Sequence, residues 1–165
     1  MIQILWDGSA LVKRYVAEIG SQTVNALFVA IPPAQMTTTV MSYSETFAAH
    51  WRKQNQSILS DAAFSTAQAA LGNEVVGNAD FVVLGLEFDD ILNGIELIER
   101  HSVNSTDAAI LQAFLRYATP LRPSAVSVLV ASDQRLLRAA KAEGIEVLDP
   151  EIVPAADIPA FLAAL

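Results

Sequence analysis

The sequence contains no cysteine, which excludes disulfide bonds, thiolate metal sites and cysteine nucleophiles. Its only imidazole groups belong to His50 and His101. Neither is part of an HExxH motif or another paired-ligand pattern, so we interpret both as surface or helix-end residues. Any metal ion must then be held by oxygen atoms, which are the ligands that Mg²⁺ and Mn²⁺ prefer.

Basic residues are few. The chain has 10 Lys and Arg against 18 Asp and Glu, and its net charge is −8. This balance argues against broad binding of a nucleic-acid backbone, which usually depends on clustered cations. The argument weakens if the acidic residues surround a metal ion, because the ion neutralises them, and a basic partner protein would neutralise others. Charge alone therefore does not decide whether the protein acts on nucleic acid.

Long apolar runs and export signals are missing as well. No apolar segment approaches the roughly 18 residues that a membrane span needs, and no basic segment precedes an apolar one at the start. We therefore expect a cytoplasmic protein that makes no membrane contact. The 165 residues, of which 53% are hydrophobic, suffice for one well-filled core, so we expect a single domain over residues 1–165.

Short β-rich segments alternate with longer amphipathic ones along the chain. The short segments predict five strands, at residues 2–6, 36–40, 81–87, 126–131 and 145–148. Helices are predicted from Ser9 onward and at residues 21–29, 42–53, 60–72, 89–100, 105–119, 133–143 and 158–165. The alternation implies right-handed crossovers, and we expect an α/β protein: a three-layer α/β/α sandwich with a central parallel sheet of four or five strands.

Four acidic residues stand where a strand ends or where the next helix begins: Asp7, Glu45, Asp107 and Asp133. The carboxyl ends of parallel strands meet at one edge of a sheet, so we expect these side chains to converge there. Four carboxylates in one partly buried place would repel one another and lose hydration unless a cation lay among them. The pattern therefore predicts divalent-metal binding and phosphate chemistry.

Each acid also has a simpler explanation on its own, because Asp and Glu are favoured in the first turn of a helix. The segment Ser42–Glu45 has the spacing of a capping box, in which the Glu side chain reaches back to the Ser backbone. Asp107 follows Asn104 at the same spacing, and Asp133 is placed to cap its helix. Asp7 is the hardest to explain in this way, because it directly follows a buried strand and points toward the ligand crevice of an α/β sheet.

Neighbouring polar residues are candidates for contacts with substrate or for support of the acids. Ser9 is placed to bond Asp7 or a metal-bound water molecule. Lys13 lies farther along the same helix and would reach a phosphate, although a solvated charge on the helix surface is the simpler interpretation. Ser132 directly precedes Asp133 and belongs to the same group. We interpret Asp89 and Asp90 as the solvent-exposed first turn of a helix.

At these positions the chain resembles the PIN domains, specifically the VapC-type toxins of type II toxin–antitoxin pairs. Trp6–Lys13 is similar to the family's opening Asp-x-Ser-Ala-Leu-Val-Lys element, and the helix of Glu45 resembles the element that carries its second acid. Ser105–Leu111 is similar to its Ser-x-Asp-Ala helix start, and Leu129–Pro150 resembles its closing segment. The order and spacing of these elements hold over nearly the whole chain.

The resemblance implies a PIN-like fold and a Mg²⁺- or Mn²⁺-dependent endoribonuclease that hydrolyses RNA with a metal-activated water. It further implies the toxin of a type II pair, a homodimer held inactive by a cognate antitoxin. The four acids would be its catalytic and metal-binding residues. Two positions depart from the family pattern: Gly8 stands where a hydroxyl residue is common, and Ala131 where Thr often precedes the last acid.

Two other functions stay open from the sequence. The low content of basic residues favours a catalytically weak PIN-like module that serves protein interaction. An aspartyl phosphatase or receiver-like phospho-acceptor would use Asp7 as the acceptor, but the phosphatase pattern requires a second Asp two residues later, where this chain has Ser9. The GxSxG, GxGxxG and GxxxxGK[ST] signatures are absent.

Overall fold

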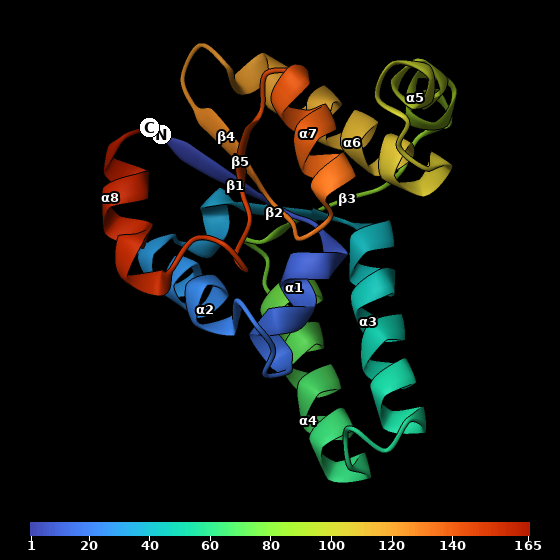
Figure 1. The fold of residues 1–165 in the computed structure, drawn as a ribbon, viewed down its shortest axis with the longest axis vertical. Coiled ribbons are helices and arrows are strands. Elements are labelled where there is room, and N and C mark those ends of the chain that lie inside the picture. The colour runs from blue at the N-terminus through green and yellow to red at the C-terminus, as the bar shows by residue number, and fades with distance from the viewer.

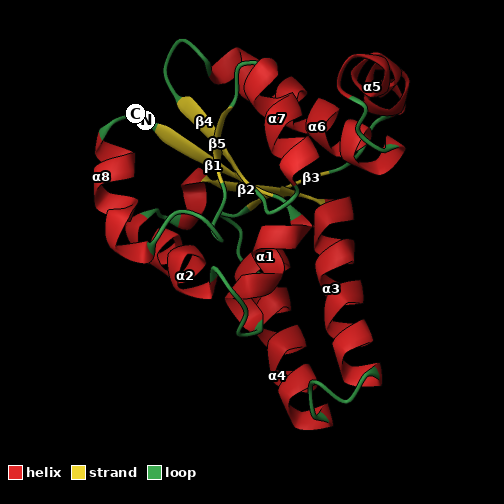
Figure 2. Cartoon of the chain, viewed as in Figure 1, coloured by secondary structure: helices red, strands yellow, loops and turns green.

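The computed structural model describes all of residues 1–165 and contains one parallel sheet covered by helices on both faces (Figure 1, Figure 2). The strands are β1 (Ile2–Trp6), β2 (Met36–Thr39), β3 (Val82–Leu84), β4 (Val126–Val130) and β5 (Glu146–Leu148). Their order is β3-β2-β1-β4-β5, and every neighbouring pair is parallel. The order reverses between β1 and β4, and at such a switch point the carboxyl ends of parallel strands leave a crevice.

The helices form two layers. They are α1 (Gly8–Tyr15), α2 (Ser21–Ala30), α3 (Val40–Asn55), α4 (Asp61–Leu71), α5 (Phe88–His101), α6 (Ser105–Ala118), α7 (Gln134–Ala142) and α8 (Ile158–Ala163). In Figure 1, α1, α2 and α8 cover one face of the sheet, and α5, α6 and α7 cover the other. The pair α3 and α4 extends away from the sheet as a long antiparallel hairpin of helices. The predicted three-layer sandwich with five parallel strands is confirmed.

Two apolar cores separate the layers, because successive strand residues point to opposite faces. Ile4 and Trp6 of β1 pack in the core beneath α1 and α2, whereas Leu5 packs in the core beneath α6 and α7. On β4, Val128 belongs to the first core and Leu129 to the second. Both faces of the sheet are therefore buried, which agrees with the continuous apolar runs in the sequence.

The start of α3 differs from the prediction. Thr39 has extended backbone and caps the helix by accepting a 3.0 Å hydrogen bond from the backbone N–H of Ser42. The helix therefore begins at Val40, one turn before the predicted capping box, and that capping box is wrong. Glu45 falls in the second turn, where its side chain is not needed for capping.

Two polar residues that we expected at the surface are buried instead. His50 is fully buried, with Nδ1 at 3.1 Å from Nε2 of Gln68 on α4. Asp90 is 1% exposed and accepts two 2.9 Å hydrogen bonds from the guanidinium of Arg116 on α6. In both cases the polar partner comes from a later helix, which supplies the contact that burial of a polar group requires. His101 does lie at a helix end, where it bonds Glu143.

Two smaller differences concern lengths. The third strand has three residues instead of the predicted seven, and α4 continues past Gly72 as a π-helical turn, Gly72–Val76, whose Val75 is buried in the core.

None of the helices is both long enough and apolar enough for a membrane crossing.

Candidate metal and active site

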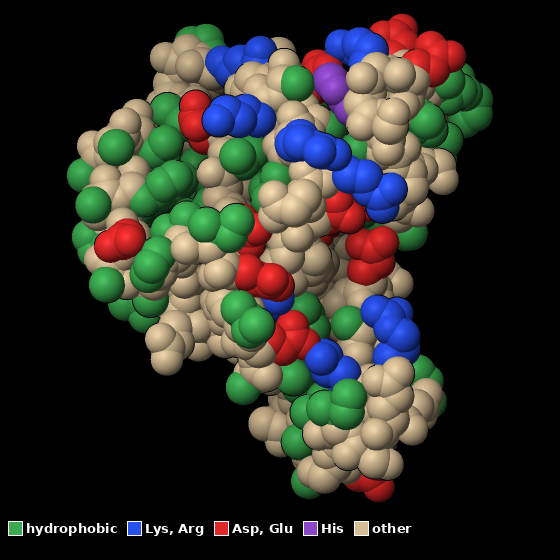
Figure 3. Space-filling view, viewed as in Figure 1, with side chains coloured by type: hydrophobic (Ala, Val, Ile, Leu, Met, Phe, Trp, Pro, Cys, Tyr) green, Lys and Arg blue, Asp and Glu red, His purple; other side chains and the backbone are tan.

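A cavity of about 570 Å³ opens beside the carboxyl ends of β1 and β4. Its walls come from α1, α3, and the first turns of α6 and α7. All seven residues singled out in the sequence line it: Asp7, Ser9, Lys13, Glu45, Asp107, Ser132 and Asp133. In Figure 3, Asp and Glu side chains gather in the middle of the visible face, between the regions that α7 and α3 occupy in Figure 1. The fold thus brings together acids that lie up to 126 positions apart in the chain.

Asp7 is 5% exposed and is held by the residue two positions later. Its Oδ2 accepts hydrogen bonds from the backbone N–H of Ser9 at 2.9 Å and from Ser9 Oγ at 2.5 Å. The same Ser9 Oγ accepts a 2.9 Å hydrogen bond from the backbone N–H of Ser132. Ser9 therefore fixes the Asp7 carboxylate and also joins α1 to the loop after β4.

The other two aspartates also stand at helix starts, where Asp133 caps α7 and Asp107 bonds the side chain that caps α6. Asp107 Oδ2 accepts a 2.8 Å hydrogen bond from Nδ2 of Asn104, the residue that caps α6. Asp133 Oδ1 accepts from the backbone N–H groups of Arg135 and Leu136 at 2.8 and 3.1 Å and so caps α7. Both acids therefore do have a structural role at the start of a helix, as the first-turn preference of Asp suggested. In each, however, only one of the two carboxylate oxygens takes part in that role.

The three aspartates share one arrangement. In each, a single oxygen accepts hydrogen bonds from residues at the helix start, and no side chain donates to the other oxygen, which is Oδ1 of Asp7, Oδ1 of Asp107 and Oδ2 of Asp133. A carboxylate of this kind is oriented by the protein and still has an oxygen available for a ligand. A structural role at the helix start is therefore compatible with ligand binding at these three positions.

Glu45 has no hydrogen-bond or ion-pair partner in the chain, although it is partly buried. Burial raises the pKa of Glu45 to about 7, and the charges of Asp7 and Asp107 add to this effect. A carboxylate without a partner in an acidic cavity is poorly stabilised as an anion. A nearby cation would stabilise its charged form.

The aspartates show the same electrostatic conflict. The pKa of Asp107 is raised to about 6, mainly by burial and also by the charges of Asp7 and Asp133, against the opposing charge of Arg135. Burial also raises the pKa of Asp7, although the hydrogen bonds from Ser9 act in the other direction. The acids of the cavity therefore influence one another, which is the mutual repulsion that the sequence pattern predicted.

Lys13 is not the solvated helix charge that we expected. It is 5% exposed, and its Nζ lies 2.7 Å from Glu151 Oε1 and 3.4 Å from Glu18 Oε2. Lys53 pairs with Glu18 as well. These cations are occupied by acids at the cavity rim, so they do not neutralise the four candidate carboxylates.

Four charged residues of the cavity wall were not found from the sequence: Glu18, Arg52, Lys53 and Glu151. The sequence did contain patterns that could have identified two of them, Arg52 and Glu151. Arg52 follows Glu45 by seven residues, which places both on one face of a helix. Glu151 follows the end of β5, so it obeys the same strand-end rule that selected the four acids.

Gly8 fits its position for a reason of packing. A β-carbon at Gly8 would lie 2.9 Å from the backbone oxygen of Ser42 and 3.1 Å from Cβ of Glu45. The glycine therefore lets α1 approach α3 closely beside the cavity. At the other departure from the family pattern, Ala131 is fully buried in the core beneath α6 and α7.

The donor atoms of the cavity suit a hard divalent cation. They are carboxylate and hydroxyl oxygens, with neither imidazole nor thiolate among the lining residues. In the side-chain positions of this structure, however, no three acidic or imidazole groups stand close enough to hold an ion directly. Binding would require rotation of acidic side chains toward Asp7 or water molecules between the ion and some of the carboxylates.

No protein-family model matches the sequence, and no curated protein is significantly similar to it. Solved structures do share its fold. VapC20 of Mycobacterium tuberculosis, a sarcin–ricin loop cleaving toxin, superposes with a TM-score of 0.62 at 18% identity over 92% of this chain and 100% of that chain. A toxin–antitoxin complex from Klebsiella pneumoniae gives 0.57 at 16% identity over 90% and 98% of the two chains. FitAcB from Neisseria gonorrhoeae gives 0.65 at 11% identity over 92% and 100%. The chain therefore has the PIN-domain fold of VapC type that its motifs predicted.

Proposed function

We propose that the protein is a Mg²⁺- or Mn²⁺-dependent endoribonuclease and the toxin of a type II toxin–antitoxin pair. One observation carries the proposal: Asp7, Glu45, Asp107 and Asp133 come from four separate elements, line one cavity and keep carboxylate oxygens without side-chain donors. The likeness to toxin structures at matching length supports it.

When bound, a divalent cation supplies Lewis-acid chemistry that polarises a phosphate and favours deprotonation of a water molecule near neutral pH. The chain's own residues bind and orient. Asp7, Glu45 and Asp107 would hold the ion directly or through water, and Asp133 would complete the set from the start of α7. Ser9 keeps Asp7 in one orientation and holds the Ser132 loop against α1. No side-chain nucleophile is needed in this scheme.

We further propose that α5 supplies a contact with a second copy of the chain. Its outer face carries four exposed apolar side chains at helical spacing: Phe88, Ile91, Leu92 and Ile95, which are 74, 57, 47 and 51% exposed. An exposed apolar patch of this kind marks an interface. The same stripe on two copies is self-complementary about a two-fold axis, which a homodimer requires.

The acidic cavity also suits an antitoxin with basic side chains. The four candidate carboxylates form no ion pair with a Lys or Arg side chain of the chain, so a Lys or Arg side chain from another protein would neutralise them in place of a metal ion. Structures of similar fold have been solved as toxin–antitoxin complexes. A partner bound in this way would block the cavity and hold the enzyme inactive.

The proposal is tested by an RNA-cleavage assay on the purified protein. The wild-type chain should cleave RNA in Mg²⁺ or Mn²⁺ and lose the activity in EDTA. Asp7→Asn should abolish cleavage while thermal unfolding shows that the chain still folds. Asp61→Asn, at an exposed position on α4, is the matched control and should retain full activity. Full activity of Asp7→Asn would overturn the assignment.

A further inference from the structure

The cations that have no partner in the chain are concentrated next to the acidic cavity. Of the 10 Lys and Arg residues, five form ion pairs with acidic side chains, and Arg122 binds a backbone carbonyl. The remaining four are Arg52, Arg135, Arg138 and Lys141. Arg52 lines the cavity from α3, and the other three lie on α7, the helix that starts at Asp133.

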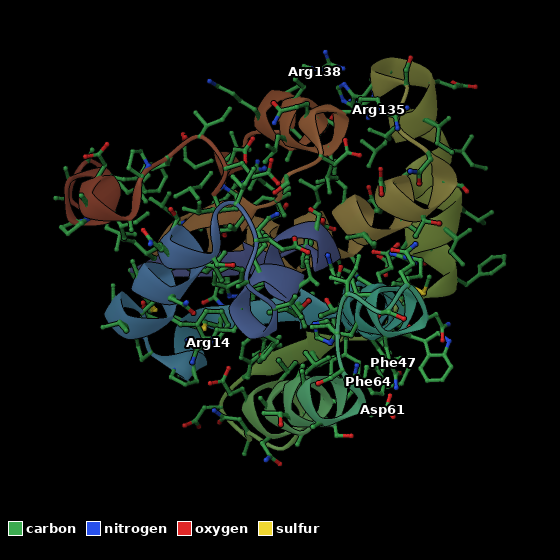
Figure 4. All side chains as sticks on the ribbon, turned by 60° about the horizontal axis from the view of Figure 1, so that its bottom comes forward. Arg14, Phe47, Asp61, Phe64, Arg135 and Arg138 are labelled. Atoms are coloured by element: carbon green, nitrogen blue, oxygen red, sulfur yellow. The ribbon has the colours of Figure 1, made fainter.

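The three residues on α7 form a row. Arg135, Arg138 and Lys141 are all exposed and follow one another at intervals of three residues, so they share one broad face of the helix over about 9 Å of its axis. Figure 4 shows Arg135 and Arg138 on the side of α7 turned away from the sheet. In Figure 3, a row of Lys and Arg side chains crosses the region of α7 and ends beside the acidic group, and further basic side chains lie over the region of α3.

Helix stability accounts for Lys141, which lies in the last turn of α7 and complements the helix dipole there, but not for Arg135 or Arg138. Arg135 is the second residue of α7, where a positive charge opposes the helix dipole. Arg138 in the middle of the helix and Arg135 both lack the acidic partners that most other cations of this chain have. In a chain with a net charge of −8, a row of unpaired cations that begins at the cavity marks a place for a negatively charged ligand.

The linear spacing of these three cations favours a nucleic-acid strand over a compact anion as the ligand. We propose that the outer face of α7, formed by Arg135, Arg138 and Lys141, binds the phosphate backbone of the single-stranded RNA as it leaves the cavity. Arg52 contacts the same strand at the opposite wall. This inference rests on the proposed function and adds to it the path of the substrate. Single-strand binding proteins use rows of cations in the same way, and such binding weakens steeply with salt.

The test measures binding separately from cleavage. Affinity of a labelled, mixed-sequence single-stranded RNA is measured by fluorescence anisotropy over a range of salt concentrations, with every protein carrying Asp7→Asn to prevent turnover. Arg135→Gln combined with Arg138→Gln should weaken binding roughly three- to tenfold and lower the slope of log K against log salt by about 1.4. The control, Arg100→Gln with Arg122→Gln, makes the same change in net charge at exposed positions away from the cavity and should leave both quantities unchanged.

The outcomes separate the two proposals. If both double variants bind RNA as the parent does while the wild-type chain cleaves RNA, the path along α7 is wrong and the nuclease remains. Equal weakening in both double variants also overturns the path, because net charge alone then explains the effect. If the α7 variant binds RNA normally but loses an acidic protein partner, the row serves that partner instead. Absence of RNA binding in every form, together with absence of cleavage by the wild type, overturns both proposals.

Discussion

Ser9 Oγ accepts a 2.9 Å hydrogen bond from the backbone N–H of Ser132, and this contact joins the chain segments that carry Asp7 and Asp133, the first and last of the four candidate acids. The same hydroxyl donates to Asp7, so one side chain both orients a carboxylate and fixes the loop before Asp133. The Ser9 hydroxyl therefore helps to hold the cavity together, while the Asp7 carboxylate keeps one oxygen available for a ligand.

Ser9→Ala tests this positioning role. The variant should lose about 1 kcal/mol of stability, because a hydrogen-bonded hydroxyl is removed. It should also move the acid limb of the pH–rate profile to higher pH, since the hydrogen bonds of Ser9 act against the burial that raises the pKa of Asp7. Thermal unfolding and RNA cleavage as a function of pH provide the two readouts. Ser65→Ala, at an exposed site on α4, is the control; a profile identical to that control would show that Ser9 is merely structural.

Gly8→Ala tests the close approach of α1 and α3. The new β-carbon would lie 2.9 Å from the Ser42 carbonyl oxygen, so the helices must move apart. We expect a loss of about 1 to 3 kcal/mol in the free energy of unfolding, together with reduced cleavage because Glu45 is displaced. Gly72→Ala is the matched control, because nothing lies within 4 Å of a β-carbon there. Equal unfolding free energies for the two variants would contradict the packing argument.

The raised pKa values predict a dependence of stability on pH. Burial and neighbouring charges raise the pKa of Glu45 from 4.5 to about 7 and that of Asp107 from 3.8 to about 6. The folded chain therefore binds these protons more tightly than the unfolded chain, so the associated stability is present at low pH and is lost as pH rises toward about 7. In EDTA, the melting temperature should fall through this window in the wild type and fall less in Glu45→Gln/Asp107→Asn. Parallel curves would contradict this account.

Mn²⁺ should reverse that loss. A cation competes with protons for the same oxygens, so the rise in melting temperature caused by Mn²⁺ should be larger at about pH 7.5 than at about pH 5.5. The double variant provides the control and should show little rise at either pH. A negligible rise in the wild type at both pH values would favour the alternative of a catalytically weak interaction module.

The exposed stripe on α5 predicts self-association. Ile91→Glu places a charge in the middle of the apolar stripe and should shift a dimer toward monomer in light scattering coupled to size exclusion. Val29→Glu, at an 88% exposed apolar position on α2, is the control and should leave the mass unchanged. A wild-type chain that is monomeric at all accessible concentrations would remove the proposed interface.

Much of the fold could be predicted from local sequence, because buried parallel strands are short apolar runs and the helices between them are amphipathic. The strand-end rule likewise selected Asp7 and Asp133 without knowledge of their contacts. Asp107 lies at the start of a helix, as expected, but that helix follows α5 and not a strand. Glu45 was also selected, but the capping box in which we placed it is wrong, because Thr39 and not Ser42 caps α3. Thr39 and Ser42 are both good capping residues, and the extended backbone of Thr39 at the end of β2 decided between them.

The burial of polar residues could not be predicted, because it depends on partners far along the chain. Asp90 is paired with Arg116, which is 26 residues later, and Lys13 with Glu151, which is 138 residues later. No local pattern identifies such pairs. The row of unpaired cations on α7 was missed for the same reason, since a cation is recognised as unpaired only after the partners of all others are known.

Direct observation of Mn²⁺ in the protein tests the central claim, that the acids of this cavity form one cation site. Crystals grown with Mn²⁺ should show an anomalous-scattering peak between Oδ1 of Asp7 and Oδ1 of Asp107, the oxygens that accept no side-chain hydrogen bond. The side chain of Glu45 should turn toward this peak, and the peak should vanish in Asp7→Asn. A cavity without this peak, in a protein that still cleaves RNA in EDTA, would contradict the account.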